Sequence, residues 1–126
     1  MDDRSRLERL TREFTAAFNR NDLEAVMAFF TDDAVYDEFN GETRRGKAAI
    51  SAAFLPQFRG DFGTIRFDEQ DIVADPESGK TLIRWNCVVE RKGKTRRWRG
   101  LDVLEFDADL IRHKSTYAKA PAPLAE

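Results

Sequence analysis

The spacing of apolar residues changes once along this chain, near Phe62, from a helical period to strict alternation. Before that point apolar residues recur three and four positions apart, and Leu7, Leu10, Phe14 and Phe18 form one such stripe. After it, apolar and polar residues alternate over long stretches that are separated by short turns. Helices followed by long strands predict an α+β domain with the helices on one face of a sheet.

Three helices and one short strand are predicted in the first half. The first helix ends at the polar segment 19–22, in which an Asn or Asp can cap a second helix that runs to Phe30. A short strand is expected at 34–39, before an Asn-Gly turn. A third helix is expected at 47–58, directly after a glycine.

Four long strands are predicted in the second half, at 63–74, 81–91, 94–106 and 110–118. Their connections are short and rich in turn residues, so neighbouring strands should pair antiparallel. A long twisted sheet that covers helices on one side tends to curl around them. The expected fold is a cone-shaped, curved antiparallel sheet around N-terminal helices, with an internal pocket.

Composition limits the classes of function. A net charge of −2 argues against a dedicated nucleic-acid binder, and no segment is long and apolar enough to span a membrane. The charged N-terminus does not resemble a signal peptide, so a cytoplasmic protein is expected. With one cysteine, Cys87, and one histidine, His113, neither a disulfide framework nor a metal site is expected, and no cofactor is implied. Residues 1–126 are expected to form a single domain, with 119–126 as an extended tail.

The turn at residues 92–93 predicts the register of the second and third long strands. A two-residue hairpin turn pairs Arg91 with Lys94. The following pairs result: Cys87 with Trp98, Trp85 with Gly100, and Ile83 with Asp102. The inward set of one strand then matches the inward set of the next, and a glycine leaves room for the opposing indole.

The register of the last strand is predicted in the same way. A four-residue loop pairs Phe106 with Ile111, which would place His113 on the inner face. His113 and Tyr117 would then be diagonal neighbours of Asp102, within reach of their long side chains.

Asp102 is the most informative candidate residue. A carboxylate on an apolar inner face is costly unless it is protonated or paired, and such placement often raises a pKa for acid–base work. A dyad with His113 would orient the imidazole as base or acid. The alternative is structural: Asp102 accepts from His113, Ser115 or Tyr117 and only fixes the interior, and His113 is a satisfied buried histidine.

The short strand leaves two alternatives open. Either Tyr36 and Glu38 point inward, and Glu38 is a second carboxylate facing Asp102, or Asp37 points inward instead. The aromatic residues of the inner face are expected to form either pocket wall or core. They are Phe14, Trp85, Trp98 and Tyr117. Cys87 is expected to be a small buried hydrophobe.

A basic segment, residues 92–99, could touch anionic ligands, but its neighbouring acids favour a solvated, ion-paired surface. On the outer sheet face, Val88, Leu101 and Val103 give an apolar centre with arginines at its rim. This pattern predicts a homodimer through that face.

Three segments resemble a known family. They are DLEAVMAFFTDDAVYDEF, GKAAISAAF and LDVLEFDADLIRHKSTYA. They resemble the nuclear transport factor 2-like superfamily, in particular its SnoaL-like branch, over nearly the whole chain. The resemblance implies a cone-shaped fold that hosts isomerases, cyclases, hydrolases, dehydratases and non-catalytic modules.

The resemblance also suggests roles for single residues. The proton-shuttling and oxyanion-hole acids of ketosteroid isomerases fall on Glu38 and Asp102, but their oxyanion tyrosine falls on Phe14, which cannot donate a hydrogen bond. The Asp–Arg–Asp set of limonene epoxide hydrolases falls on Cys87, Trp85 and Thr116, which argues against that chemistry. Polyketide cyclases use an acid and a histidine, as Asp102 and His113 could.

The resulting expectation is a cofactor-independent isomerase, cyclase or dehydratase that acts on a small apolar carbonyl compound. Its catalytic residues would be Asp102, His113 and Glu38, and its substrate would contact Phe14, Tyr36, Trp85, Trp98 and Tyr117. In the mechanism, a protonated Asp102 donates to the developing oxyanion. The alternative is a non-catalytic ligand-binding or dimerisation module.

Overall fold

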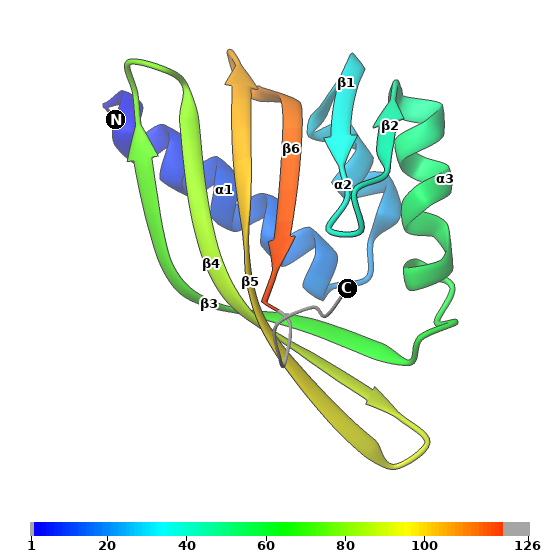
Figure 1. Cartoon of the computed structure of the whole chain (residues 1–126). Helices are drawn as coiled ribbons and strands as arrows, with labels where there is room; N and C mark the ends of the chain where they lie inside the picture. The colour runs from blue at the N-terminus through cyan, green and yellow to red at the C-terminus, as the bar shows by residue number, and fades with distance from the viewer. Residues whose placement is uncertain (1, 120–126) are drawn as a thin grey trace, which may run out of the picture.

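A computed structural model describes residues 2–119, in which three helices pack against one curved, open sheet (Figure 1). The helices are α1 (Asp3–Asn19), α2 (Leu23–Ala28) and α3 (Lys47–Phe58). The strands are β1 (Phe30–Asp37), β2 (Thr43–Arg45), β3 (Thr64–Asp75), β4 (Lys80–Arg91), β5 (Lys94–Asp107) and β6 (Leu110–Ala118). The sheet order is β2-β1-β6-β5-β4-β3, which confirms the α+β class. Most of the expected tail, 120–126, lies outside the described residues.

The ends of α1 and α2 follow from local capping. Asp2 accepts a hydrogen bond from the backbone N–H of Ser5, and Asp22 accepts one from Ala25. The second helix ends earlier than expected, because Phe30 starts β1 instead of extending α2. Phe30 pairs with Ile111 of β6 and is fully buried, so sheet pairing overrides the helical spacing.

The sheet is antiparallel except for one pair. The hairpins β3–β4, β4–β5 and β5–β6 are antiparallel, as their short turns predict. β1 instead runs parallel to β6, so the sheet is mixed. The two strands are far apart in sequence, and no connecting turn constrains their relative direction.

The core lies between the helices and the concave face of the sheet. Phe14, Phe18, Phe30 and Phe54 pack there, mostly edge to face, as in the Phe14–Phe18 pair at 5.1 Å between ring centres. A second cluster, around Ile83, Trp85 and Cys87, continues along the inner face of β3, β4 and β5. The lower parts of these three strands run beyond the helices (Figure 1).

The predicted register of β4 and β5 is confirmed at every pair. Arg91 lies opposite Lys94, and Ile83 lies opposite Asp102. Gly100 lies opposite Trp85, and a Cβ at position 100 would approach the indole to 2.4 Å. The glycine is therefore required by the close approach of the indole ring.

The predicted register of β6 is correct at its start and wrong after it. Ile111 pairs with Phe106 as expected, but His113 pairs with Glu105 instead of Leu104. Arg112 is an extra, unpaired residue, a β-bulge that reverses which side chains face inward. Lys114 consequently takes the inward position, and His113 turns to the outer face.

Candidate functional site

A buried ion pair lies on the inner face of the sheet. The Lys114 ammonium is 3.1 Å from one carboxylate oxygen of Asp102, and both side chains are almost fully buried. Thr116 lies between them, donating to Asp102 at 2.6 Å and accepting from Lys114 at 2.6 Å. The other Asp102 oxygen accepts from the Trp85 indole at 3.3 Å. The bulge at Arg112 and the hairpin register together create this network.

Aromatic rings enclose the ammonium. Lys114 Nζ lies 4.4 Å from the centre of the Tyr36 ring, and the Phe18 and Phe54 rings are within 6 Å. Burial alone would lower the pKa of Lys114, but the charge of Asp102, aided by Tyr36, outweighs it and raises the pKa. The amine therefore stays protonated, and the interior holds a fixed positive charge.

Asp102 faces inward as predicted, but its partners differ from those predicted. It accepts three hydrogen bonds, from Trp85, Lys114 and Thr116, and the structure gives it no donor role. The expected dyad with His113 is wrong, because the bulge places His113 on the opposite face. The donors that the structural alternative names, His113, Ser115 and Tyr117, form no hydrogen bond with Asp102 within residues 2–119.

His113 belongs to a separate cluster on the outer face. Its Nε2 lies 2.7 Å from Asp37, and its Nδ1 lies 3.8 Å from Glu105. Hydrogen bonds from Thr43, and then from His113, lower the pKa of Asp37. A shallow hollow of about 150 Å³ adjoins this cluster and includes Tyr117. Asp37 therefore points outward, and Tyr36 points into the core.

Glu38 lies just beyond the end of β1. Its carboxylate accepts a hydrogen bond from Arg44 at 2.7 Å, and its side chain is partly buried. Among the described residues, no hydrogen bond or ion pair joins Glu38 to Asp102. The pair of facing carboxylates is therefore not formed.

The expected pocket residues divide between core and surface. Phe14 and Trp85 are buried in packed clusters, and Trp98 is half-buried beside Cys87. Tyr117 is 60% exposed on the outer face, where the bulge has placed it, so it lines no inner pocket. Burial raises the pKa of the Cys87 thiol to about 11, in agreement with its expected inert role.

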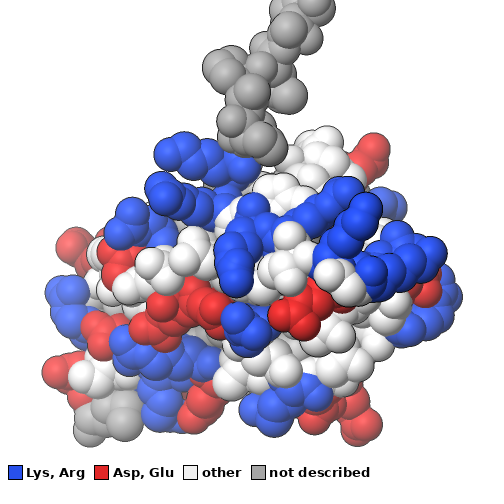
Figure 2. Space-filling view, turned by 90° about the horizontal axis from the view of Figure 1, so that it is seen from below, with Lys and Arg blue, Asp and Glu red and all other residues white. Residues whose placement is uncertain are grey.

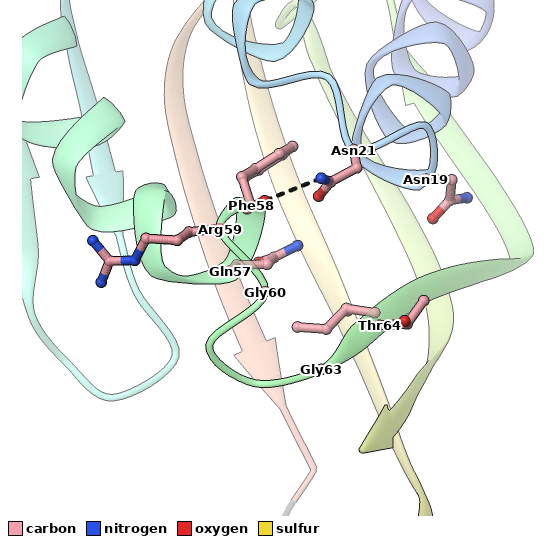
Figure 3. Close-up of a pocket in the computed structure, with 9 residues that line it drawn as sticks. Asn19, Asn21, Gln57, Phe58, Arg59, Gly60, Gly63 and Thr64 are labelled. Atoms are coloured by element: carbon pink, nitrogen blue, oxygen red, sulfur yellow. Dashed lines mark hydrogen bonds between the residues drawn. The ribbon is translucent and has the colours of Figure 1, made fainter. Parts of the chain in front are cut away.

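The larger hollow, of about 330 Å³, lies at the open end of the cone (Figure 3). Its wall comes from the end of α1, the end of α3 and the start of β3. The lining residues are Asn19, Asn21, Gln57, Phe58, Arg59, Gly60, Gly63, Thr64 and Ile65. None of these lining residues belongs to the Asp102–Lys114 network, so the hollow and the buried ion pair are separate features.

Carboxamides hold this hollow in shape. Asn19 donates to and accepts from the backbone of Phe67, at 2.9 and 2.8 Å, which fixes α1 to β3. Asn21 donates to the Phe58 carbonyl at 3.0 Å (Figure 3). Gln57 is half-buried and forms no side-chain hydrogen bond within residues 2–119. Its amide is therefore available to a ligand.

Sequence reasoning missed Lys114 and the hollow. Simple alternation with His113 inward places Lys114 on the outer face, because alternation cannot reveal a bulge. A signal did exist, since a buried Asp102 needs a counter-charge and Lys114 is a nearby cation on the adjacent strand. The hollow gave no signal, because its residues come from three distant segments.

Two kinds of feature are absent from the described residues. No group of three or more His, Cys, Asp and Glu side chains within residues 2–119 is placed to hold a metal ion. In the same part of the chain, every helix is too short or too polar to cross a membrane.

A family model that matches most of the chain identifies the family of this protein. The model of the SnoaL-like domain family matches residues 11–114. The chain belongs to the SnoaL-like family. A search of curated protein sequences finds no match.

Solved structures agree with this family. A candidate polyketide cyclase from Xanthomonas campestris pv. campestris is 22% identical, with a TM-score of 0.80 and 92% of each chain covered. Bal32a, from a soil-derived mobile gene cassette, is 19% identical, with a TM-score of 0.80 and coverage of 93% of this chain and 92% of Bal32a. PrhC from Penicillium brasilianum is 18% identical, with a TM-score of 0.82 and coverage of 94% of this chain and 83% of PrhC. At these identities the likeness establishes the fold alone.

Proposed function

We propose that this SnoaL-like protein binds a small, largely apolar molecule in the hollow at the open end of its cone. The observation that carries the proposal is the hollow itself, whose volume of about 330 Å³ lies within the range of small-molecule sites. Phe58 and Ile65 supply apolar surface, and the unpaired Gln57 amide supplies one polar contact. Such a site suits a ligand with a carbonyl or hydroxyl group on an apolar body.

Blocking the hollow tests this proposal. The protein is screened by native mass spectrometry and calorimetry against small cyclic ketones, hydroxy-ketones and medium-chain alcohols. Ile65→Trp, which fills the hollow, is expected to abolish binding of any hit, and Gln57→Leu to weaken it about fivefold, the size of one hydrogen bond. Gln70→Leu, on the exposed edge of β3, is the control. Equal binding by wild type and Ile65→Trp would disprove the site.

A second candidate function is cofactor-independent acid–base catalysis on a carbonyl compound. It is favoured by the Asp102–Lys114 pair, because a buried ion pair is weak evidence for stability and common at functional sites. In this mechanism the Asp102 carboxylate removes a proton next to the carbonyl, and the Lys114 ammonium stabilises the oxyanion. Glu38 is paired with Arg44, and His113 is hydrogen-bonded to Asp37 on the outer face, so neither takes part.

Turnover assays on the same compounds distinguish catalysis from binding. Asp102→Asn is expected to lower turnover by roughly 10²–10⁴-fold if the carboxylate is the base. Asp37→Asn, a carboxylate on the outer face, is the matched control. If compounds bind but are never converted, the proposed binding function stands and the proposed catalytic function is wrong.

We also propose that two copies associate through the outer sheet face. Leu101 and Val103 are half-buried there, and Tyr117 on the same face is largely exposed. Arg97 and Arg99 lie on the same face and would supply the polar border of such an interface.

A further inference from the structure

The β4–β5 hairpin carries an unusual concentration of positive charge. Residues 91–99 contain six basic residues and no acidic one, so the rest of the chain has 15 of the 21 basic residues against all 23 acidic ones. Within residues 2–119, none of these six side chains forms an ion pair. The expectation of an ion-paired surface is therefore wrong for this segment. In the view from below, basic side chains gather around uncharged surface at this end, with acidic ones between them (Figure 2).

The register divides these cations between the two faces of the hairpin. Arg91, Lys94 and Arg96 share the face of Trp85 and Cys87, which is the inner face of the sheet. The remaining strand cations, Arg97 and Arg99, lie on the outer face. Because β4 and β5 extend past the helices, the inner-face cations remain exposed (Figure 1).

An apolar surface joins the hollow to the inner-face cations. Ile65 lines the hollow and pairs with Val89, which pairs with Arg96 on the next strand. Two strand spacings separate Ile65 from Arg96, about 10 Å. Val89 and Trp98 lie between or beside them and are only half-buried. The hollow, the apolar surface and the cations therefore follow one another along the same face.

We propose that the ligand of this site is an anionic amphiphile, an apolar body that carries a carboxylate or similar acid group. The apolar body occupies the hollow and lies along Ile65, Val89 and Trp98. The acid group contacts Lys94 and Arg96, with Arg91 adding to the positive potential. This inference rests on the proposed binding function and specifies the class of ligand.

The charge distribution favours a small anion over a polyanion. The body next to the hairpin carries a large excess of acid, which would repel an extended nucleic acid. A single acid group needs only the few cations at the end of the apolar surface. An anionic lipid bilayer offers the same chemistry, so the test includes vesicles.

The test compares an acid with its uncharged counterpart, decanoate with 1-decanol, below the micelle concentration of decanoate. Calorimetry measures both affinities for wild type, for Lys94→Gln/Arg96→Gln, and for the matched outer-face variant Arg97→Gln/Arg99→Gln. The inner-face variant is expected to weaken the affinity for decanoate roughly fivefold, the size of one or two exposed ion pairs. Its affinity for decanol should be unchanged. The outer-face variant is expected to change the affinity for each compound by less than about twofold.

Each outcome has a separate meaning. If neither compound binds wild type, or if Ile65→Trp still binds both, the proposed binding function fails and the inference fails with it. If both bind the hollow but the inner-face variant affects them equally, the binding function stands and the anionic class is overturned. Charge-dependent binding to phosphatidylglycerol vesicles, without binding of free decanoate, would also overturn it in favour of a membrane surface.

Discussion

Lys114 and Asp102 depend on one another, because each would be a buried, unpaired charge without its partner. Lys114→Met should therefore lower the free energy of unfolding by about 3–5 kcal/mol, since the Asp102 carboxylate loses its counter-charge. The double variant Asp102→Leu/Lys114→Met should recover much of that loss, because it leaves no buried charge. Urea denaturation gives the free energy of unfolding of the wild type and of the two variants. A double variant less stable than Lys114→Met would contradict this account.

Cys87 provides a test of burial on the inner face. Its pKa of about 11 leaves roughly one thiol in a thousand ionised at pH 8. Native protein should therefore react with a disulfide reagent at least a hundredfold more slowly than protein unfolded in urea at the same pH. The rate should rise as the pH approaches 11, because the thiolate is the reactive form. Rapid reaction of native protein at pH 8 would show that the inner face is open at this point.

At the scale of elements, the β6 bulge decides which side chains enter the interior. Deleting Arg112 would remove the extra residue, so that the Ile111–Phe106 and His113–Glu105 pairs follow one another directly and Lys114 stays inward. We expect the deletion to keep the Asp102–Lys114 pair and to cost little more than the exposed ion pair between Arg112 and Glu105. Arg112→Ala keeps the bulge and loses only an exposed ion pair with Glu105, so its expected cost is below about 1 kcal/mol. Thermal unfolding by circular dichroism compares the two, and a loss of about 3–5 kcal/mol for the deletion alone would show that Lys114 had left the interior.

The difference between what the sequence predicted and what it missed has a local cause. The β4–β5 register was predictable because a two-residue turn fixes it and the pairing of Trp85 with Gly100 supports it. The bulge at Arg112 leaves no mark in the composition of β6 itself, and only the need of a buried Asp102 for a counter-charge pointed to it. The parallel pairing of β1 with β6 joins distant segments, which no turn constrains. For these reasons the sequence predicts an acid–histidine dyad at Asp102, whereas the structure holds an acid–lysine pair there.

At the scale of the whole molecule, the helices cover only the concave face of the sheet, so the convex face is left without a layer of its own (Figure 1). That face holds Leu101, Val103 and the largely exposed Tyr117. A stable dimer buries about 800 Å² on each partner, and we expect the outer face of β5 and β6 to supply that area. Light scattering after size exclusion should therefore give about twice the chain mass of 14.5 kDa at micromolar concentration.

Charge placed at the centre of this face should separate the two copies. Val103→Lys would bury an ammonium at the centre of the interface, and we expect it to shift the mass towards that of one chain while the circular dichroism spectrum is retained. Gln70→Lys adds the same charge on an exposed position of the edge strand β3, and it should leave the dimer intact. A wild-type protein that stays monomeric at micromolar concentration would refute the dimer. A Val103→Lys variant that stays dimeric would instead place the interface elsewhere on the molecule.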